Sequence, residues 1–254
     1  MTPIWVVQNC KDRQTEKILA ALKEVGEPFI LTARDIFTEF INFDEVDLIP
    51  YGSTSLLEFA KEHNWRYVFH NDNFRTDVYA SRHSRMLNND AMIMSLSAFK
   101  LLTETRPQWF IRPVLDLKSF AGFTAPSKEI VEWITRLEAV ECEVDSNTLV
   151  SVASPKVIDM EWRYFIVDGK IITGSSYKHR GKSYIYEETD KKVLDEAQEL
   201  AMEWLPHENC CMDVALWEDK PYVVEFNGLN SSGFYDHNVV ALVRAVSTYA
   251  KLRS

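Results

Sequence analysis

Two segments joined by Asp168-Gly169 constrain the fold more than any other part of the sequence. Residues 161–167 and 170–177 are rich in β-branched and aromatic side chains, a composition typical of strands. Asp-Gly is a favoured central pair for a type I′ turn, whose twist suits a tight β-hairpin. The second half of the chain is therefore predicted to contain an antiparallel hairpin.

The length of that turn also predicts which residues face one another. With a two-residue loop, the expected cross-strand pairs are Val167–Lys170, Arg163–Gly174, Glu161–Ser176 and, one step further, Asp159–Lys178. Glu161, Arg163 and Lys178 would then share one face, and the small residues opposite the charges would leave room for a ligand. A salt-bridged, solvent-exposed sheet face is the alternative interpretation.

A second pair of short strands spans residues 211–227 and carries oxygen-rich side chains. Glu225 and Asn227 point to the same side because side chains alternate along a strand. Asp213 joins them if the loop is the three residues 218–220, and faces away if the loop has two. Two carboxylates and an amide oxygen on one face suit Mg²⁺. An acidic, solvated strand face is the other interpretation of these residues.

Strands alternate with helices at the beginning of the chain. The predicted strands are 4–8, 29–31, 46–49 and 67–69, and the predicted helices are 15–25 and one that begins at Ser55. This alternation predicts a parallel α/β sheet, a small Rossmann-like lobe. The lobe lacks the G-x-G-x-x-G pattern of dinucleotide-binding folds.

The middle of the chain carries a second set of basic residues. A strand over 109–114 contains Arg112-Pro113 and runs into a loop with Lys118 and Gly122, a pattern that can cover phosphate groups. Solvent exposure of Lys118 is the simpler alternative. The remaining predicted elements are helices over 89–102, 127–137, 192–204 and 238–252 and a strand over 149–153.

Composition argues against several classes of protein. The net charge of −10 argues against broad nucleic-acid binding. No apolar run approaches the roughly 20 residues that cross a bilayer. The four cysteines, which show no CxxC spacing, suggest neither zinc nor a disulfide framework. The N-terminus is predicted to be a strand and not a signal peptide, so a cytoplasmic location is expected.

In this order, the motifs resemble the ATP-grasp superfamily, and more closely a phage and bacterial branch with Arg-Pro where others have Lys-Pro. The motifs are Arg112-Pro113 with its Lys118 loop, Glu161-x-Arg163, and Asp213 followed by Glu225-x-Asn227. The resemblance implies an α/β (α+β) chain with a Rossmann-like pre-ATP lobe and connecting helix over 1–104. An ATP-grasp domain with two lobes and antiparallel sheets would follow over 105–254.

The resemblance also implies roles for individual residues, with ATP and Mg²⁺ as cofactors and ATP lying between two lobes. Arg112, Lys118 and Arg163 would act in catalysis. ATP would contact Arg112, Lys118, Val150, Val152, Ala153, Ser154, Glu161, Arg163, Lys178 and Asn230. The metal ligands would be Asp213, Glu225 and Asn227. Residues 228–233 would face the acceptor.

The activity that the resemblance implies is a carboxylate–amine ligase that forms a C–N bond through an acylphosphate. Its substrates would be small molecules, amino acids or peptides, without nucleic acid or membrane, and the protein could form a homodimer. Because phosphoryl transfer needs positioning and charge neutralisation, basic groups and a metal suffice without a nucleophilic side chain. A kinase and a non-catalytic nucleotide-binding module are the alternatives.

Overall fold

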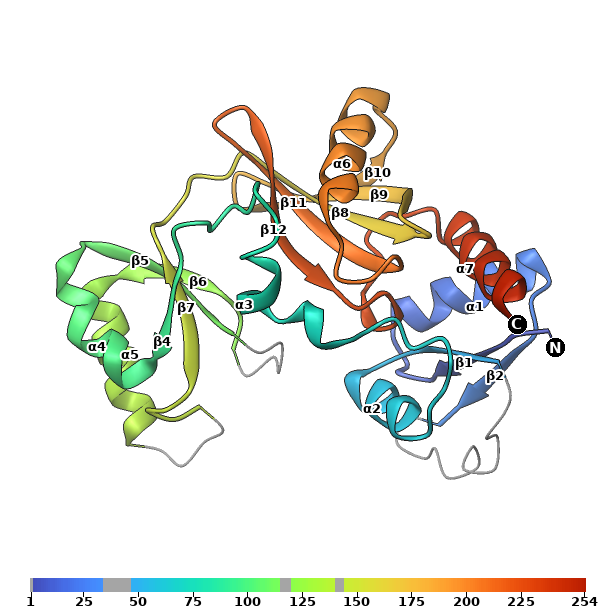
Figure 1. The fold of residues 1–254 in the computed structure, drawn as a ribbon, viewed down its shortest axis with the longest axis horizontal. Coiled ribbons are helices and arrows are strands. Elements are labelled where there is room, and N and C mark those ends of the chain that lie inside the picture. The colour runs from blue at the N-terminus through green and yellow to red at the C-terminus, as the bar shows by residue number, and fades with distance from the viewer. Residues whose placement is uncertain (1, 34–46, 115–119, 140–143) are drawn as a thin grey trace. The chain divides into compact units, whose positions relative to one another are not determined.

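The computed structural model describes residues 2–33, 47–114, 120–139 and 144–254, and its chain forms two compact units (Figure 1). Unit 1 combines residues 1–71 with 158–254, and unit 2 is the segment 72–157 between them. The chain thus leaves unit 1 after the N-terminal α/β segment and returns to it later. These junctions follow spatial contacts, and the sequence boundary after residue 104 stays a prediction.

The N-terminal part of unit 1 is a parallel sheet, as the alternating pattern predicts. Its strands have the order β2-β1-β3. The elements are β1 (Ile4–Gln8), α1 (Arg13–Val25), β2 (Phe29–Thr32), β3 (Leu48–Tyr51) and α2 (Thr54–Glu62). Helix α1 begins after Asp12, whose carboxylate accepts from the Thr15 amide, and ends at Gly26, which has a φ of 80°.

The strand predicted over 67–69 is absent, because the side chain of Asn230 takes the place of a neighbouring strand. Its Oδ1 accepts from the Phe69 amide at 2.7 Å, and its Nδ2 donates to the carbonyls of Tyr67 at 3.0 Å and Pro50 at 2.7 Å. Asn230 is 0% exposed. One buried amide therefore joins the short segment 67–69 to β3 and to the C-terminal part of unit 1.

The C-terminal part of unit 1 is an antiparallel sheet with the order β10-β9-β8-β11-β12. Its strands are β8 (Met160–Val167), β9 (Lys170–His179), β10 (Lys182–Glu188), β11 (Cys210–Trp217) and β12 (Lys220–Asn227). Its helices are α6 (Lys191–Glu203) and α7 (Val239–Arg253), with the short turn η4 (Leu229–Ser231) after β12. Strand β10 is an element that the sequence pattern did not predict.

One face of β8 changes from apolar to charged along its length. Phe165 and Val167 lie in the main core of unit 1 with side chains of α1 and α7, such as Ile18 and Val243. Earlier on the same face of the strand is the charged side chain of Arg163, because positions two apart share a face. The core therefore anchors one end of the strand and leaves the other end for polar side chains.

Unit 2 is built on a four-stranded antiparallel sheet with the order β4-β7-β5-β6. Its elements are η2 (Asp72–Phe74), α3 (Thr76–Tyr79), β4 (Met92–Ser95), α4 (Leu96–Leu102), η3 (Thr103–Thr105), β5 (Gln108–Pro113), β6 (Phe123–Pro126), α5 (Ser127–Glu138) and β7 (Leu149–Ala153). The prediction of one helix over 89–102 is wrong in its first half. Residues 92–95 pair with β7 instead, and Ser95 then caps α4 by accepting from the Ala98 amide.

No helix in the described part of the chain is long and apolar enough to cross a membrane.

Truncation of Asn230 should destabilise unit 1 strongly. The Asn230→Ala variant loses three buried hydrogen bonds and leaves backbone groups unpaired, which costs about 1–3 kcal/mol for each group. We expect a fall of several kcal/mol in the free energy of unfolding, measured by urea denaturation. Ser231→Ala, a truncation of the half-buried neighbour, should change that free energy by less than about 1 kcal/mol. Similar losses in both variants would contradict the role given to Asn230.

Candidate functional site

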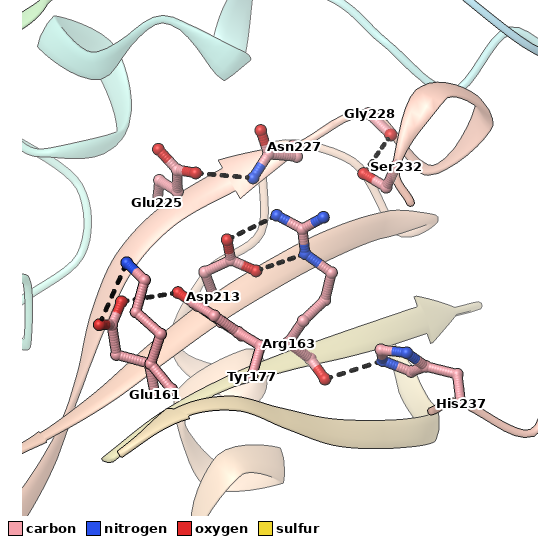
Figure 2. Close-up of polar contacts among 10 residues, drawn as sticks. Glu161, Arg163, Tyr177, Asp213, Glu225, Asn227, Gly228, Ser232 and His237 are labelled. Atoms are coloured by element: carbon pink, nitrogen blue, oxygen red, sulfur yellow. Dashed lines mark hydrogen bonds and ion pairs between the residues drawn. The ribbon is translucent and has the colours of Figure 1, made fainter. Parts of the chain in front are cut away.

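A row of charged side chains crosses three neighbouring strands on one face of the five-stranded sheet. Arg163 on β8 lies directly opposite Asp213 on β11, and Asp213 lies directly opposite Glu225 on β12. Asn227 follows two residues after Glu225 and so projects from the same face. Figure 2 shows these side chains together with Glu161, Tyr177 and His237. The tertiary pairing thus brings the predicted Glu-x-Arg and Asp/Glu/Asn motifs together.

Asp213 reaches this face by a route that differs from the expected one. The turn has the two residues Glu218 and Asp219, with φ values of 51° and 60°, and Trp217 pairs with Lys220. A turn of that length would send Asp213 to the opposite face. The register shifts between Asp213 and Val214, because β12 contains an extra residue there. The β-bulge replaces the three-residue loop that the alternation of side chains required.

Bulges also correct the pairs predicted for the first hairpin. The Val167–Lys170 pair is as predicted, but the register then shifts twice. The observed pairs further along are Arg163–Ser175 and Glu161–Lys178 in place of Arg163–Gly174, Glu161–Ser176 and Asp159–Lys178. The predicted register was wrong because each extra residue in β9 moves the pairing by one position. Lys178 consequently lies opposite Glu161, with its Nζ 3.5 Å from Oε1.

Arg163 and Asp213 form a buried, two-pronged ion pair at the centre of the row. Arg163 Nε donates to Oδ1 of Asp213 at 2.8 Å and Nη2 donates to Oδ2 at 2.7 Å. The two side chains are 14% and 4% exposed. Burial raises the pKa of Asp213 to about 6, and the guanidinium of Arg163 opposes that rise. The carboxylate raises the pKa of Arg163 well above its usual value, although burial acts against this.

Two tyrosines enclose the ion pair on the same face. The rings of Tyr177 and Tyr235 stack with centroids 4.9 Å apart, and the guanidinium of Arg163 lies 5.3 Å from the Tyr235 centroid. The Tyr177 hydroxyl donates to Glu161 Oε2 at 2.9 Å. Tyr177 is at a register shift of β9, so sequence alternation alone could not place it here. These contacts hold Glu161 and Arg163 in fixed positions.

The chemistry of Asp213, Glu225 and Asn227 fits a hard divalent cation such as Mg²⁺. All three offer oxygen atoms, and two of them are carboxylates on adjacent strands. In this structure their polar atoms have other partners, since Asn227 Nδ2 donates to Glu225 Oε1 at 3.1 Å and Asp213 holds Arg163. Within the described residues, no three His, Cys, Asp or Glu side chains gather closely enough to hold a metal. Metal binding would therefore require these contacts to rearrange.

His237 supports the ion pair from the side of the backbone. Its Nε2 lies 3.0 Å from the carbonyl oxygen of Arg163, which can only accept, so Nε2 carries the proton. The ring packs edge-on against Phe165, and its buried Nδ1 has no hydrogen-bond partner among the described residues. Burial lowers the pKa of His237 to about 3, against the opposing effect of that hydrogen bond. His237 is therefore a neutral residue that fixes the backbone under Arg163.

The loop over 228–233 is held largely by its own unit. Ser232 Oγ donates to the Gly228 carbonyl at 2.8 Å, and the Ser232 carbonyl accepts from the Tyr51 hydroxyl at 3.0 Å. Asn230, expected to contact ATP, is instead buried with all three side-chain bonds directed to backbone groups. This contact network gives Asn230 a structural role.

The predicted adenine-binding stretch lies in unit 2. The side chains of Val150 and Val152 are in the hydrophobic core, and β7 has strand neighbours on both sides. The Ser154 amide donates to Asp90 Oδ2 at 3.0 Å, and Asp90 also holds Lys156 at 2.7 Å. Asp90 and Lys156 thus fix the end of this strand, a role that the sequence patterns did not reveal. Backbone contacts between residues 150–154 and adenine stay a prediction.

The predicted phosphate-binding loop is described only in part. Arg112 lies on β5 opposite Ser151 of β7. Gly122 packs so closely on β5 that an added Cβ would lie 3.2 Å from Arg112 Cβ and 3.1 Å from the Phe110 ring. This close approach favours glycine. Lys118 falls in the segment 115–119, outside the described residues.

The sequence also matches a known protein family. A family model described as an ATP-grasp domain, the second family of its clade, matches residues 90–245, which is more than half of the chain. The chain therefore belongs to the ATP-grasp superfamily. This match confirms the resemblance that the Arg-Pro, Glu-x-Arg and Asp/Glu/Asn motifs indicate.

Several ligases of known structure have the same fold. D-cycloserine synthetase DcsG has a TM-score of 0.62 and 11% identity, with 98% of this chain and 99% of that chain covered. D-alanine–D-alanine ligase from Bacillus anthracis gives 0.61 and 12%, with 100% of each chain covered. The ATP-grasp ligase PsnB, in complex with a minimal precursor, Mg and ADP, gives 0.62 and 14%, with 98% of each chain covered. The mixed α/β ATP-grasp fold is thereby confirmed.

A search of curated protein sequences found no match to this chain.

His237 should make the protein lose stability in mild acid. Its pKa is about 3 in the folded state and near 6.5 when unfolded, so the unfolded chain binds the proton first as the pH falls below 6.5. Between pH 7 and pH 5 this costs about 2 kcal/mol of unfolding free energy. His237→Gln cannot titrate and should lose less stability over that interval by this amount. Equal pH dependence of both proteins in urea denaturation would refute the assignment.

Proposed function

We propose that the protein is an ATP- and Mg²⁺-dependent ligase that joins a carboxylate to an amine or a related nucleophile. The observation that carries the proposal is the row of Arg163, Asp213 and Glu225 across three strands, in a chain that belongs to the ATP-grasp superfamily. ATP and Mg²⁺ are the cofactors of ATP-grasp ligases, and neighbours of the same fold were solved with ATP and with Mg and ADP.

The proposed metal ligands are Asp213, Glu225 and Asn227. Their oxygen atoms match the preference of Mg²⁺ for a few carboxylates together with phosphate oxygens. Bound there, Mg²⁺ would neutralise charge on the phosphates and help to orient them. Asp213 contributes the carboxylate at the centre of the row, and Glu225 contributes one from the neighbouring strand.

The proposed phosphate contacts are basic side chains from several elements. Arg163 offers a guanidinium whose planar fork matches phosphate oxygens. Lys178 lies opposite Glu161 on the same sheet and adds a point charge. The family resemblance assigns Arg112 and Lys118 to phosphates as well, and the backbone near residues 150–154 to adenine. Asn230 is left out, because its side chain is saturated by backbone groups.

The proposed reaction transfers the terminal phosphoryl group of ATP to a carboxylate oxygen, giving an acylphosphate and ADP. The acceptor amine then attacks the acyl carbon, phosphate leaves, and loss of a proton from nitrogen gives the amide. Structural neighbours include a ligase named for D-alanine and one complexed with a precursor peptide, so amino acids and peptides are both candidate substrates for this chain. A homodimer stays a prediction.

Loss of a metal-ligating carboxylate should weaken Mg²⁺ binding and abolish most turnover. In Asp213→Asn or Glu225→Gln, one negative charge beside the cation disappears, and we expect the apparent Mg²⁺ affinity for ATP hydrolysis or ligation to fall at least about tenfold. Glu218→Gln removes an exposed carboxylate from the turn of the same hairpin and should leave that affinity unchanged. Unaltered Mg²⁺ dependence in Asp213→Asn would rule out the metal assignment.

The reaction class is tested by product analysis. Incubation with ATP, Mg²⁺ and pools of amino acids and short peptides should release ADP and phosphate only when a suitable acid and amine are both present. Mass spectrometry should find a product equal to the two substrates minus one water. A stable phosphorylated product without an amide would indicate a kinase, and ATP binding without any turnover would indicate a binding module.

A further inference from the structure

The Arg163–Asp213 ion pair uses both partners in a way that conflicts with their proposed roles in the loaded site. Asp213 is proposed to ligate Mg²⁺, and Arg163 is proposed to bind phosphate. In the structure, however, the fork of Arg163 engages both oxygens of Asp213 at 2.7 and 2.8 Å. The guanidinium and a metal would repel one another at such a distance, so the carboxylate cannot hold both in this geometry.

The surroundings make this pair stable without any ligand. Asp213 is buried and would be costly to leave without a positive partner. Tyr235 lies under the guanidinium, and His237 holds the backbone carbonyl of Arg163 in place. The carboxylates of Glu161 and Glu225 lie on the same face and make a compensating cation more favourable. Arg163 therefore supplies charge balance in the ligand-free state.

Resting on the proposed function, we infer that Arg163 is an internal counter-cation of Asp213 that exchanges with Mg²⁺ only when nucleotide phosphates are present. Mg²⁺ alone would have to leave Arg163 largely buried without an anion. Phosphate oxygens give the displaced guanidinium a new partner that suits its planar fork. Metal and nucleotide then bind with positive coupling, because each removes an obstacle to the other.

The neighbouring hydrogen bonds define what has to change and what can stay. Asn227 releases Glu225, and the side chain of Arg163 rotates away from Asp213 while its backbone stays fixed by His237. The Tyr177 hydroxyl can keep its bond to Glu161, since that bond involves neither Arg163 nor Asp213. The exchange needs side-chain motion only, with the sheet register unchanged.

Binding of Mn²⁺ to the nucleotide-free protein tests the inference. Mn²⁺ stands in for Mg²⁺ and is followed by electron paramagnetic resonance. Arg163→Met keeps length and apolar bulk but removes the charge, so we expect Mn²⁺ alone to bind at least about tenfold more tightly than to the wild type. Arg180→Met removes an exposed charge of the same sign just after β9 and should leave Mn²⁺ affinity within about twofold. The Arg163→Met/Asp213→Asn double variant should lose the gain.

The binding of a non-hydrolysable ATP analogue with Mg²⁺ should change in the opposite direction. Calorimetry should show weaker analogue binding to Arg163→Met, because one phosphate contact is lost. A pair that only supports the fold would weaken both kinds of binding when it is broken. Tighter Mn²⁺ binding together with weaker analogue binding supports the exchange, and unchanged or weaker Mn²⁺ binding in a folded Arg163→Met protein overturns it.

A second variant and the wild type itself distinguish the remaining outcomes. If Arg163→Met does not fold, Arg163→Lys decides, because lysine keeps the charge but cannot bond both oxygens as a fork. Its Mn²⁺ affinity should then rise several-fold, and no rise overturns the exchange. If the wild type binds no analogue with Mg²⁺, the proposed function fails instead, whatever Mn²⁺ alone does.

Discussion

The buried ion pair between Arg163 and Asp213 is the interaction on which the arrangement of the candidate site depends. It joins the central strands β8 and β11, and removal of one partner from such a pair typically costs about 3–5 kcal/mol. Apolar neighbours on the same strands, Phe165 and Cys211, belong to the main core of unit 1 and fix the register that makes the pair possible. The core thereby determines where the charges meet.

Charge balance links the fold to the proposed chemistry. A face with three acidic side chains, Glu161, Asp213 and Glu225, needs positive charge in every state that the protein occupies. Without ligand, Arg163 and Lys178 provide it. With ligand, a metal ion would take over part of that role while the phosphates engage the basic side chains. The same electrostatic requirement therefore accounts for the stability of the ligand-free site and for its expected preference for a metal–nucleotide complex.

The segment after β12 shows how a polar residue can be essential without touching a ligand. Asn230 lies in a loop of small polar residues directly after the strand of Glu225 and Asn227, which made a ligand contact a reasonable prediction. Its amide instead replaces a strand at residues 67–69 and joins distant parts of unit 1. Sequence proximity to a site cannot distinguish these roles, because the partners of a buried amide are set by tertiary packing.

The sequence by itself determined the hairpins, the parallel N-terminal sheet and the family, because turn residues, alternation and motif order are local properties. It also identified Arg163, Asp213, Glu225 and Asn227 as candidate residues. Tertiary structure decided which of them meet. Bulges in β9 and β12 shift the register by whole residues, and packing between strands selects them, so neither turn length nor alternation could predict that Arg163 would lie between Ser175 and Asp213.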